Sequence, residues 1–125
     1  MLDAPVDAAE AVSWFQQAWN EPDSAQRLIL LKSCCAQDAE FASPEGMIRG
    51  LEPFNASIDA FLRAFPRAQV LFGTPDAHNG YVRVRWRTLF DDGTHGPIFG
   101  DDFMQFDAAG RLHKVISFDG SPTDA

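Results

Sequence analysis

The sequence predicts an α+β domain in which helices come first and close one end of a curved antiparallel sheet around an apolar pocket. Apolar residues recur at every third or fourth position in the first half of the chain, but they alternate with polar residues from Ala68 onward. The turn-forming sequences Asp91-Asp92-Gly93 and Asp107-Ala108-Ala109-Gly110 separate the alternating segments. Helices followed by a run of short strands are typical of α+β domains.

The first helix is expected to begin at Asp7. Asp7 is a favourable N-cap, and Glu10 three residues later has the spacing of a capping box. Pro22 disfavours helical geometry at Glu21, so the helix ends before this proline. Its apolar stripe consists of Ala8, Ala11, Val12, Phe15 and Trp19.

Two further helices are expected before the strands. Asp23 or Ser24 starts the second, which continues to Cys35. The third runs from Gly50 to Phe65 and ends before Pro66. Its apolar face consists of Leu51, Phe54, Ile58, Phe61, Leu62 and Phe65.

Five strands are expected, with a loop at residues 43–46 and a turn at residues 75–80. In the long strand 81–90, Val82, Val84 and Trp86 share one side and alternate with arginines. The strands are expected at residues 40–42, 69–72 and 81–90, in a segment ending at 102–106, and at residues 111–118.

Size and charge limit the classes of partner. The 125 residues are the size of one domain, so we expect residues 1–125 to form a single domain. The formal net charge of −8 argues against nucleic acid or an anionic membrane as partner, because both attract basic surfaces. The segment 1–5 lacks the basic start and apolar run of a signal peptide, so we expect a cytoplasmic protein.

Cysteine and histidine do not indicate a metal or redox site. Cys34 and Cys35 are neighbours in an apolar pattern, and we interpret them as free packing residues; a vicinal redox pair is the alternative. His78, His95 and His113 are far apart in the chain and lack metal-ligand spacing. We therefore expect no metal and no cofactor.

Several short motifs together resemble one known superfamily. The motifs are Trp19-Asn20-Glu21-Pro22-Asp23, Phe41-Ala42-Ser43-Pro44, Gly50 at the start of the third helix, Phe65-Pro66 at its end, Asp76-Ala77-His78 before Arg83-Val84-Arg85-Trp86, Gly100-Asp101-Asp102, and the segment from Phe106 to Leu112. In this order and spacing they resemble the nuclear transport factor 2-like superfamily, also called SnoaL-like, over nearly the whole chain. The resemblance implies a cystatin-like cone fold, and homodimers are common in that superfamily. Many unrelated activities share this fold, so the fold does not give the function.

The superfamily includes ketosteroid isomerase, which uses an Asp base and an oxyanion hole made of a Tyr and a protonated Asp. By the resemblance, Asp102 matches the protonated Asp, Ser43 matches the base, and Phe15 matches the Tyr. Serine without a partner is not basic at neutral pH, and phenylalanine donates no hydrogen bond. We therefore do not expect standard ketosteroid isomerase activity. The Asp102 position also resembles that of the acid/base Asp in SnoaL-like cyclases.

Asp102 is our candidate catalytic residue. It shares strand parity with Met104 and Phe106, which places its carboxyl group on an apolar face where burial shifts its pKa or requires a specific partner. A structural ion pair with an arginine is the alternative: a β-bulge would turn Arg83 or Arg85 inward. The candidate ligand contacts are Phe15, Trp19, Phe54, His78, Arg83, Trp86 and Met104.

The leading hypothesis is a pocket for a small apolar or oxygenated organic molecule, in which Asp102 acts as acid, base or hydrogen-bonding anchor. The chemistry would be proton transfer of the isomerase, cyclase, dehydratase or hydratase type. The second hypothesis is a non-catalytic ligand-binding or dimerisation module that uses the exposed face of the sheet. An open cone favours the first hypothesis, and a cone filled with Phe and Trp side chains favours the second.

Overall fold

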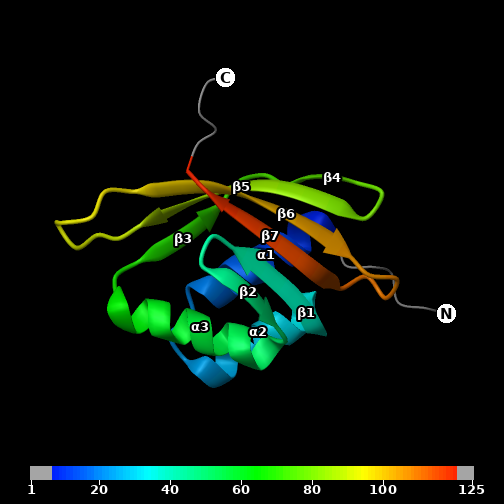
Figure 1. The fold of residues 1–125 in the computed structure, drawn as a ribbon, viewed down its shortest axis with the longest axis horizontal. Helices are drawn as coiled ribbons and strands as arrows, with labels where there is room; N and C mark the ends of the chain where they lie inside the picture. Colours follow the sequence, from blue (N-terminus) through cyan, green and yellow to red (C-terminus); the bar gives the residue numbers. More distant parts are fainter. Residues whose placement is uncertain (1–6, 121–125) are drawn as a thin grey trace.

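The computed structural model describes residues 7–120, which form three helices beneath one curved sheet (Figure 1). Helix α1 (Ala8–Trp19) begins after Asp7, whose carboxylate accepts a hydrogen bond from the Glu10 N–H at 2.8 Å. Helix α2 spans Ser24–Cys34 and helix α3 spans Leu51–Ala64. The predicted Asp7 cap is therefore confirmed. The segment 1–5, on which the signal-peptide prediction was based, lies outside the described residues.

The sheet is mixed and has seven strands in the order β2-β1-β7-β6-β5-β3, with β4 paired to another part of β5. The helices lie against its concave side (Figure 1). The strands are β1 (Cys35–Ser43), β2 (Gly46–Arg49), β3 (Gln69–Phe72), β4 (Asp76–His78), β5 (Tyr81–Leu89), β6 (Ile98–Phe106) and β7 (Leu112–Asp119).

This architecture confirms the predicted α+β cystatin-like fold, with corrections in detail. Strand β1 pairs in parallel with β7, because α3 carries the chain from one edge of the sheet to the other. Cys35 begins β1 rather than ending a helix, and β1 is longer than the predicted strand 40–42. Strand β2 was not predicted and follows the predicted loop 43–46, whereas β4 lies within the predicted turn 75–80. All three residues of β4 are exposed, so it has no apolar alternation to detect.

The arginines of β5 all lie on the outer face of the sheet. The strand pairs with β6 without a register shift from Tyr81 to Thr88, so the inward bulge considered above does not occur. Arg83 forms an ion pair with Asp76 at 2.7 Å, and Arg85 pairs with Asp101 at 3.4 Å. Two of the three arginines of β5 thus pair with carboxylates on the outer face, and no arginine of this strand turns toward Asp102.

The cysteines pack as free thiols at the junction of α2 and β1. Both are buried, and their sulfur atoms lie 3.7 Å apart. The neighbouring thiol of Cys34, together with burial, raises the pKa of Cys35 well above its ordinary value. A protonated, buried thiol is unreactive, which agrees with a packing role. Separately, no helix within residues 7–120 is both long enough and apolar enough to cross a lipid bilayer.

Candidate functional site: an aromatic cavity with a buried aspartate

A cavity of about 400 Å³ lies between the helices and the concave face of the sheet. It is within the size range of small-molecule sites. Its lining is mostly apolar and draws on α1, α3 and the inner faces of six strands. The lining residues are Phe15, Trp19, Phe41, Ala42, Ser43, Glu45, Ile48, Phe54, Ser57, Phe61, Val70, Phe72, Trp86, Thr88, Phe90, Ile98, Asp102, Val115, Ser117 and Asp119.

Aromatic rings form one continuous wall of this cavity. The rings of Phe41 and Phe54 stack with centroids 3.6 Å apart, and Phe15 lies parallel to Phe54 at 5.9 Å. The Trp19 ring stands nearly perpendicular to those of Phe54 and Phe61, with centroids 5.8 Å apart in each pair. Such contacts fix the ring orientations. The wall is therefore a preformed apolar surface.

Asp102 lies on the opposite, sheet-side wall. It is on the inner face of β6 between Val84 of β5 and Ser117 of β7, and only 4% of the residue is exposed. The indole N–H of Trp86 donates a hydrogen bond to Asp102 Oδ1 at 2.8 Å. Burial raises the pKa of the Asp102 carboxyl from 3.8 to about 7, although hydrogen bonds from Ser117 and Trp86 act in the opposite direction. The raised pKa brings proton uptake and release by Asp102 close to neutral pH.

Gly100 allows Trp86 to reach Asp102. The two residues are register partners on neighbouring strands. A Cβ atom at position 100 would overlap the indole ring of Trp86 and the carbonyl oxygen of Phe118. The missing side chain thus lets the indole lie against β6 with its N–H directed at the carboxylate.

Two more carboxylates lie at the cavity. Glu45, in the turn between β1 and β2, accepts a hydrogen bond from the Ser43 hydroxyl at 2.8 Å, and Asp119 ends β7. Partial burial is the main cause that raises the pKa of Asp119, and repulsion from Glu45 is the second cause. Both residues are largely exposed, whereas Asp102 is buried.

Comparison with known proteins identifies solved structures that share this fold. No protein-family model matches the sequence, and no curated protein matches it. A solved structure of a proposed SnoaL-like isomerase from Agrobacterium tumefaciens matches with a TM-score of 0.80 and 28% identity, covering 89% of this chain and 95% of that one. The chain belongs to the nuclear transport factor 2-like superfamily.

More distant structures of the superfamily support the same fold. A nuclear transport factor 2-like protein of unknown function from Cytophaga hutchinsonii matches with a TM-score of 0.69 and 11% identity, covering 95% of each chain. A proposed SnoaL-like polyketide cyclase from Jannaschia matches with a TM-score of 0.70 and 14% identity, covering 95% of this chain and 90% of that one.

Within this nuclear transport factor 2-like fold, five of the eight predicted site residues line the cavity described above. They are Phe15, Trp19, Phe54, Trp86 and Asp102. The three positions matched to the catalytic groups of ketosteroid isomerase, Phe15, Ser43 and Asp102, also meet there. The side chains at two of those positions remain unsuited to that reaction.

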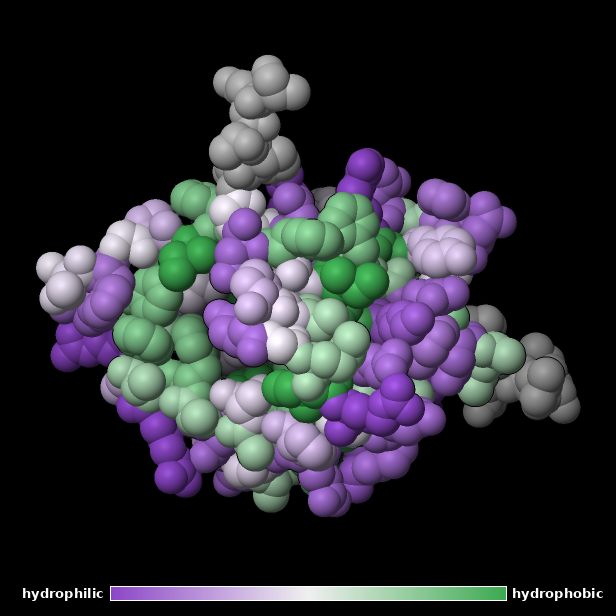
Figure 2. Space-filling model, in the orientation of Figure 1, coloured by the Kyte–Doolittle hydropathy of each residue, from purple (hydrophilic) through white to green (hydrophobic). Residues whose placement is uncertain are grey.

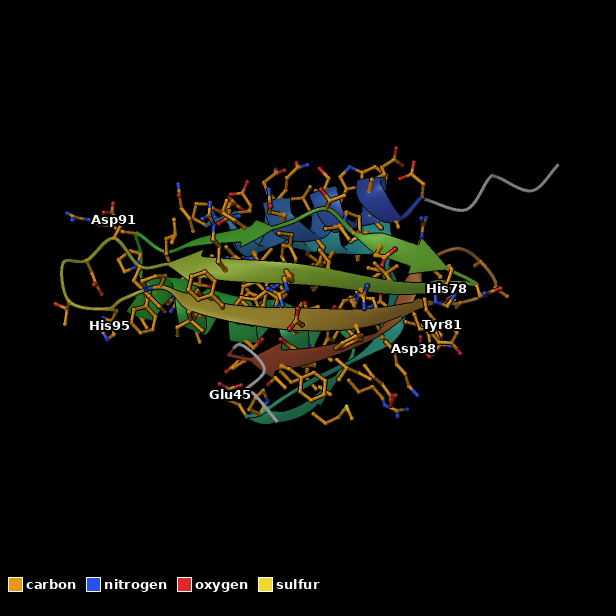
Figure 3. The ribbon with its side chains drawn as sticks, turned by 90° about the horizontal axis from the view of Figure 1, so that it is seen from above. Asp38, Glu45, His78, Tyr81, Asp91 and His95 are labelled. Atoms are coloured by element: carbon orange, nitrogen blue, oxygen red, sulfur yellow. The ribbon has the colours of Figure 1, made fainter. Side chains whose placement is uncertain are left out.

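The other three predicted ligand contacts lie elsewhere. Met104 is 2% exposed and packs in the core between Val82 and Val115, beyond the cavity lining. Arg83 is on the outer face of the sheet. His78 lies at the end of β5 opposite Asp91 and His95, whereas the cavity extends toward the end that bears Phe90 (Figure 3). We therefore leave these three residues out of the site proposed below.

Sequence reasoning missed several polar residues of the cavity. Thr88 shares strand parity with Trp86, so its inward direction could have been read from the alternation. Ser117 lies opposite Asp102 only because β6 and β7 pair in this register. Glu45 and Asp119 meet through the pairing of distant strands, for which the sequence offers no local signal.

Proposed function

We propose that this protein binds a small apolar or oxygenated organic molecule in the aromatic cavity and that Asp102 transfers a proton to or from it. The observation that carries the proposal is a buried carboxyl group at the wall of an open 400 Å³ cavity with a pKa of about 7. A general acid or base works best when its pKa lies near the operating pH. An ordinary surface aspartate, with a pKa near 4, is a weak base and is rarely protonated at neutral pH.

In the proposed step, Asp102 takes one proton from the ligand and gives the same proton back. The Asp102 carboxylate removes a proton from a carbon beside a carbonyl group, which leaves an enolate. The resulting carboxylic acid then returns that proton to another atom of the same molecule. Isomerisation, cyclisation and dehydration or hydration all contain such a step. The Trp86 N–H holds one carboxylate oxygen at 2.8 Å and so positions the other for the ligand.

Replacing Asp102 by Asn should abolish this transfer. We would incubate the protein with a panel of neutral cyclic ketones in deuterated water and follow exchange at the carbon beside the carbonyl by NMR. The wild-type rate should rise as pH increases through about 7 and Asp102 ionises. Asp102→Asn should lower the rate by about 10²–10⁴-fold, the usual contribution of a general base.

The neighbouring Asp101→Asn is the matched control for this experiment. Asp101 is one residue away but points to the outer face, where it pairs with Arg85. Its replacement removes only a minor repulsion that raises the pKa of Asp102, so it should change exchange far less than Asp102→Asn. Full exchange activity in Asp102→Asn would remove Asp102 from the mechanism.

The alternative function is a non-catalytic ligand-binding or association module. An open cone favours ligand binding, whereas a cone filled by Phe and Trp side chains favours a purely associative role. The aromatic rings line one wall and leave about 400 Å³ free. An open cavity supports the ligand-binding proposal over a purely associative role.

We also propose that the chain, as a single domain, forms a homodimer through the outer face of its sheet. This face exposes Met47, Phe99, Phe103, Ile116 and Phe118, between 40% and 65% each. Phe103 and Phe118 contact each other edge to face, and apolar side chains are exposed over β6 and β7 (Figure 2). A cluster of exposed large apolar residues is typical of an interface.

The dimer proposal predicts an oligomeric state. Size-exclusion chromatography with light scattering should give twice the mass of one chain. The double variant Phe103→Asp/Phe118→Asp should give a monomer, because it places charges in the interface. A wild-type monomer at high concentration would contradict the proposal.

A further inference from the structure

The charge of the cavity lining is entirely negative. Asp102, Asp119 and Glu45 contribute carboxyl groups, and none of the lining residues is lysine, arginine or histidine. Among residues 7–120, six ion pairs form, and each uses a carboxylate other than these three. Residues 7–120 therefore supply no cation to the cavity.

Glu45 and Asp119, the two exposed carboxylates at the cavity, form no ion pair with any residue of the described chain. Glu45 raises the pKa of Asp119, so the two carboxylates repel each other. The hydroxyl of Ser43 donates to Glu45 and adds no charge. A positive group placed between these carboxylates would relieve the repulsion, and a negative group would increase it.

The aromatic wall favours the same kind of ligand. Trp19, Phe15 and Phe54 line one apolar space, and the Trp19 ring stands nearly perpendicular to that of Phe54. Ring faces attract organic cations, and tryptophan does so most strongly. An apolar body beside aromatic rings and a charged nitrogen beside carboxylates is the usual arrangement for recognising an organic ammonium ion.

We propose that the ligand is an apolar molecule that carries a positively charged nitrogen, which lies beside Glu45 and Asp119 while the apolar body packs on the aromatic wall toward Asp102. This inference rests on the proposed function and adds the charge class of the ligand. Carboxylated molecules of the same shape should bind most weakly, because each would add negative charge to a cavity whose charged residues are all acidic.

Three probes with one ring system test this charge selectivity. The probes are 1-naphthylmethylammonium, 1-naphthylmethanol and 1-naphthylacetate, which carry positive, zero and negative charge. Binding is followed at pH 8 by the NMR signals of the indole N–H groups. Trp19 and Trp86 line the cavity and should shift, whereas Trp14 does not line it and serves as an internal control.

The ammonium probe should bind about tenfold more tightly than the alcohol, and the carboxylate should bind most weakly. Added salt should reduce the difference, since Glu45 and Asp119 are exposed. The double variant Glu45→Gln/Asp119→Asn should bring the affinity for the ammonium close to that for the alcohol. The charge-matched control Glu10→Gln/Asp38→Asn removes two exposed carboxylates outside the lining and should retain the wild-type order.

The outcomes separate this inference from the proposed function. Equal binding of the ammonium and the alcohol, or tightest binding of the carboxylate, would overturn the charge inference and leave ligand binding in the cavity intact. Absence of any shift at Trp19 and Trp86 with all three probes would contradict ligand binding itself, and the charge inference with it.

Discussion

Burial of Asp102 should lower the free energy of unfolding of the wild-type protein by about 4 kcal/mol between pH 4 and pH 8, and Asp102→Asn should remove this contribution. The cause is the burial of Asp102, whose carboxyl has a pKa of about 7 in the folded chain and an ordinary value of 3.8 when exposed. Urea unfolding of both proteins at a series of pH values measures the effect.

The direction follows from proton binding. Below about pH 4, Asp102 is protonated in both the folded and the unfolded chain, and its contribution to stability does not change. Between pH 4 and pH 7 the folded chain keeps a proton that the unfolded chain has released, so rising pH favours unfolding by about 1.4 kcal/mol per pH unit. Above pH 7 the group is ionised in both states, and the curve levels off.

The comparison with Asp102→Asn isolates this one group. Asparagine resembles the protonated carboxyl in shape and can still accept the hydrogen bond from Trp86. The variant should therefore match the wild type near pH 4 and exceed its stability at pH 8. Asp119, whose pKa is also raised, contributes a smaller slope in both proteins because it is largely exposed. Parallel stability curves for the two proteins would show that Asp102 does not titrate as a buried group.

The local part of the fold is well predicted from the sequence. The cap at Asp7, the strand Gln69–Phe72 and the alternation of β5 all depend on neighbouring residues. The parallel pairing of β1 with β7 joins segments about seventy residues apart and has no local pattern. Strand β4 has no buried face, so the period of its apolar residues carries no information.

The same division holds for the candidate site. The inward direction of Asp102 follows from its parity with Met104, and the aromatic wall follows from helical stripes on α1 and α3. The acidic pair of Glu45 and Asp119 depends on the closure of the sheet. The charge class of the ligand could therefore be inferred only from the three-dimensional structure.

A second large effect concerns Arg27, which the sequence did not single out. This arginine of α2 is fully buried. Its guanidinium donates to the carbonyl oxygens of Glu21 at 2.9 Å and Pro22 at 3.2 Å, and to the side-chain oxygen of Asn55 at 3.0 Å. Its Nη2 also lies 3.4 Å from Asp59. One side chain thus joins the α1–α2 connection to α3, which forms part of the cavity wall.

Arg27→Met should lower the free energy of unfolding by about 3–5 kcal/mol, as is typical when one partner of a buried polar network is removed. Methionine fills a similar volume, so the loss comes from acceptors that lose their donor, above all the buried side-chain oxygen of Asn55, rather than from a void. Urea unfolding at pH 7 measures the change. Arg63→Met is the matched control, because Arg63 pairs with the same Asp59 at 2.9 Å while its side chain is 83% exposed. An exposed pair contributes about 0–1 kcal/mol. Equal effects of the two substitutions would show that the buried hydrogen bonds of Arg27 do not hold the helices together.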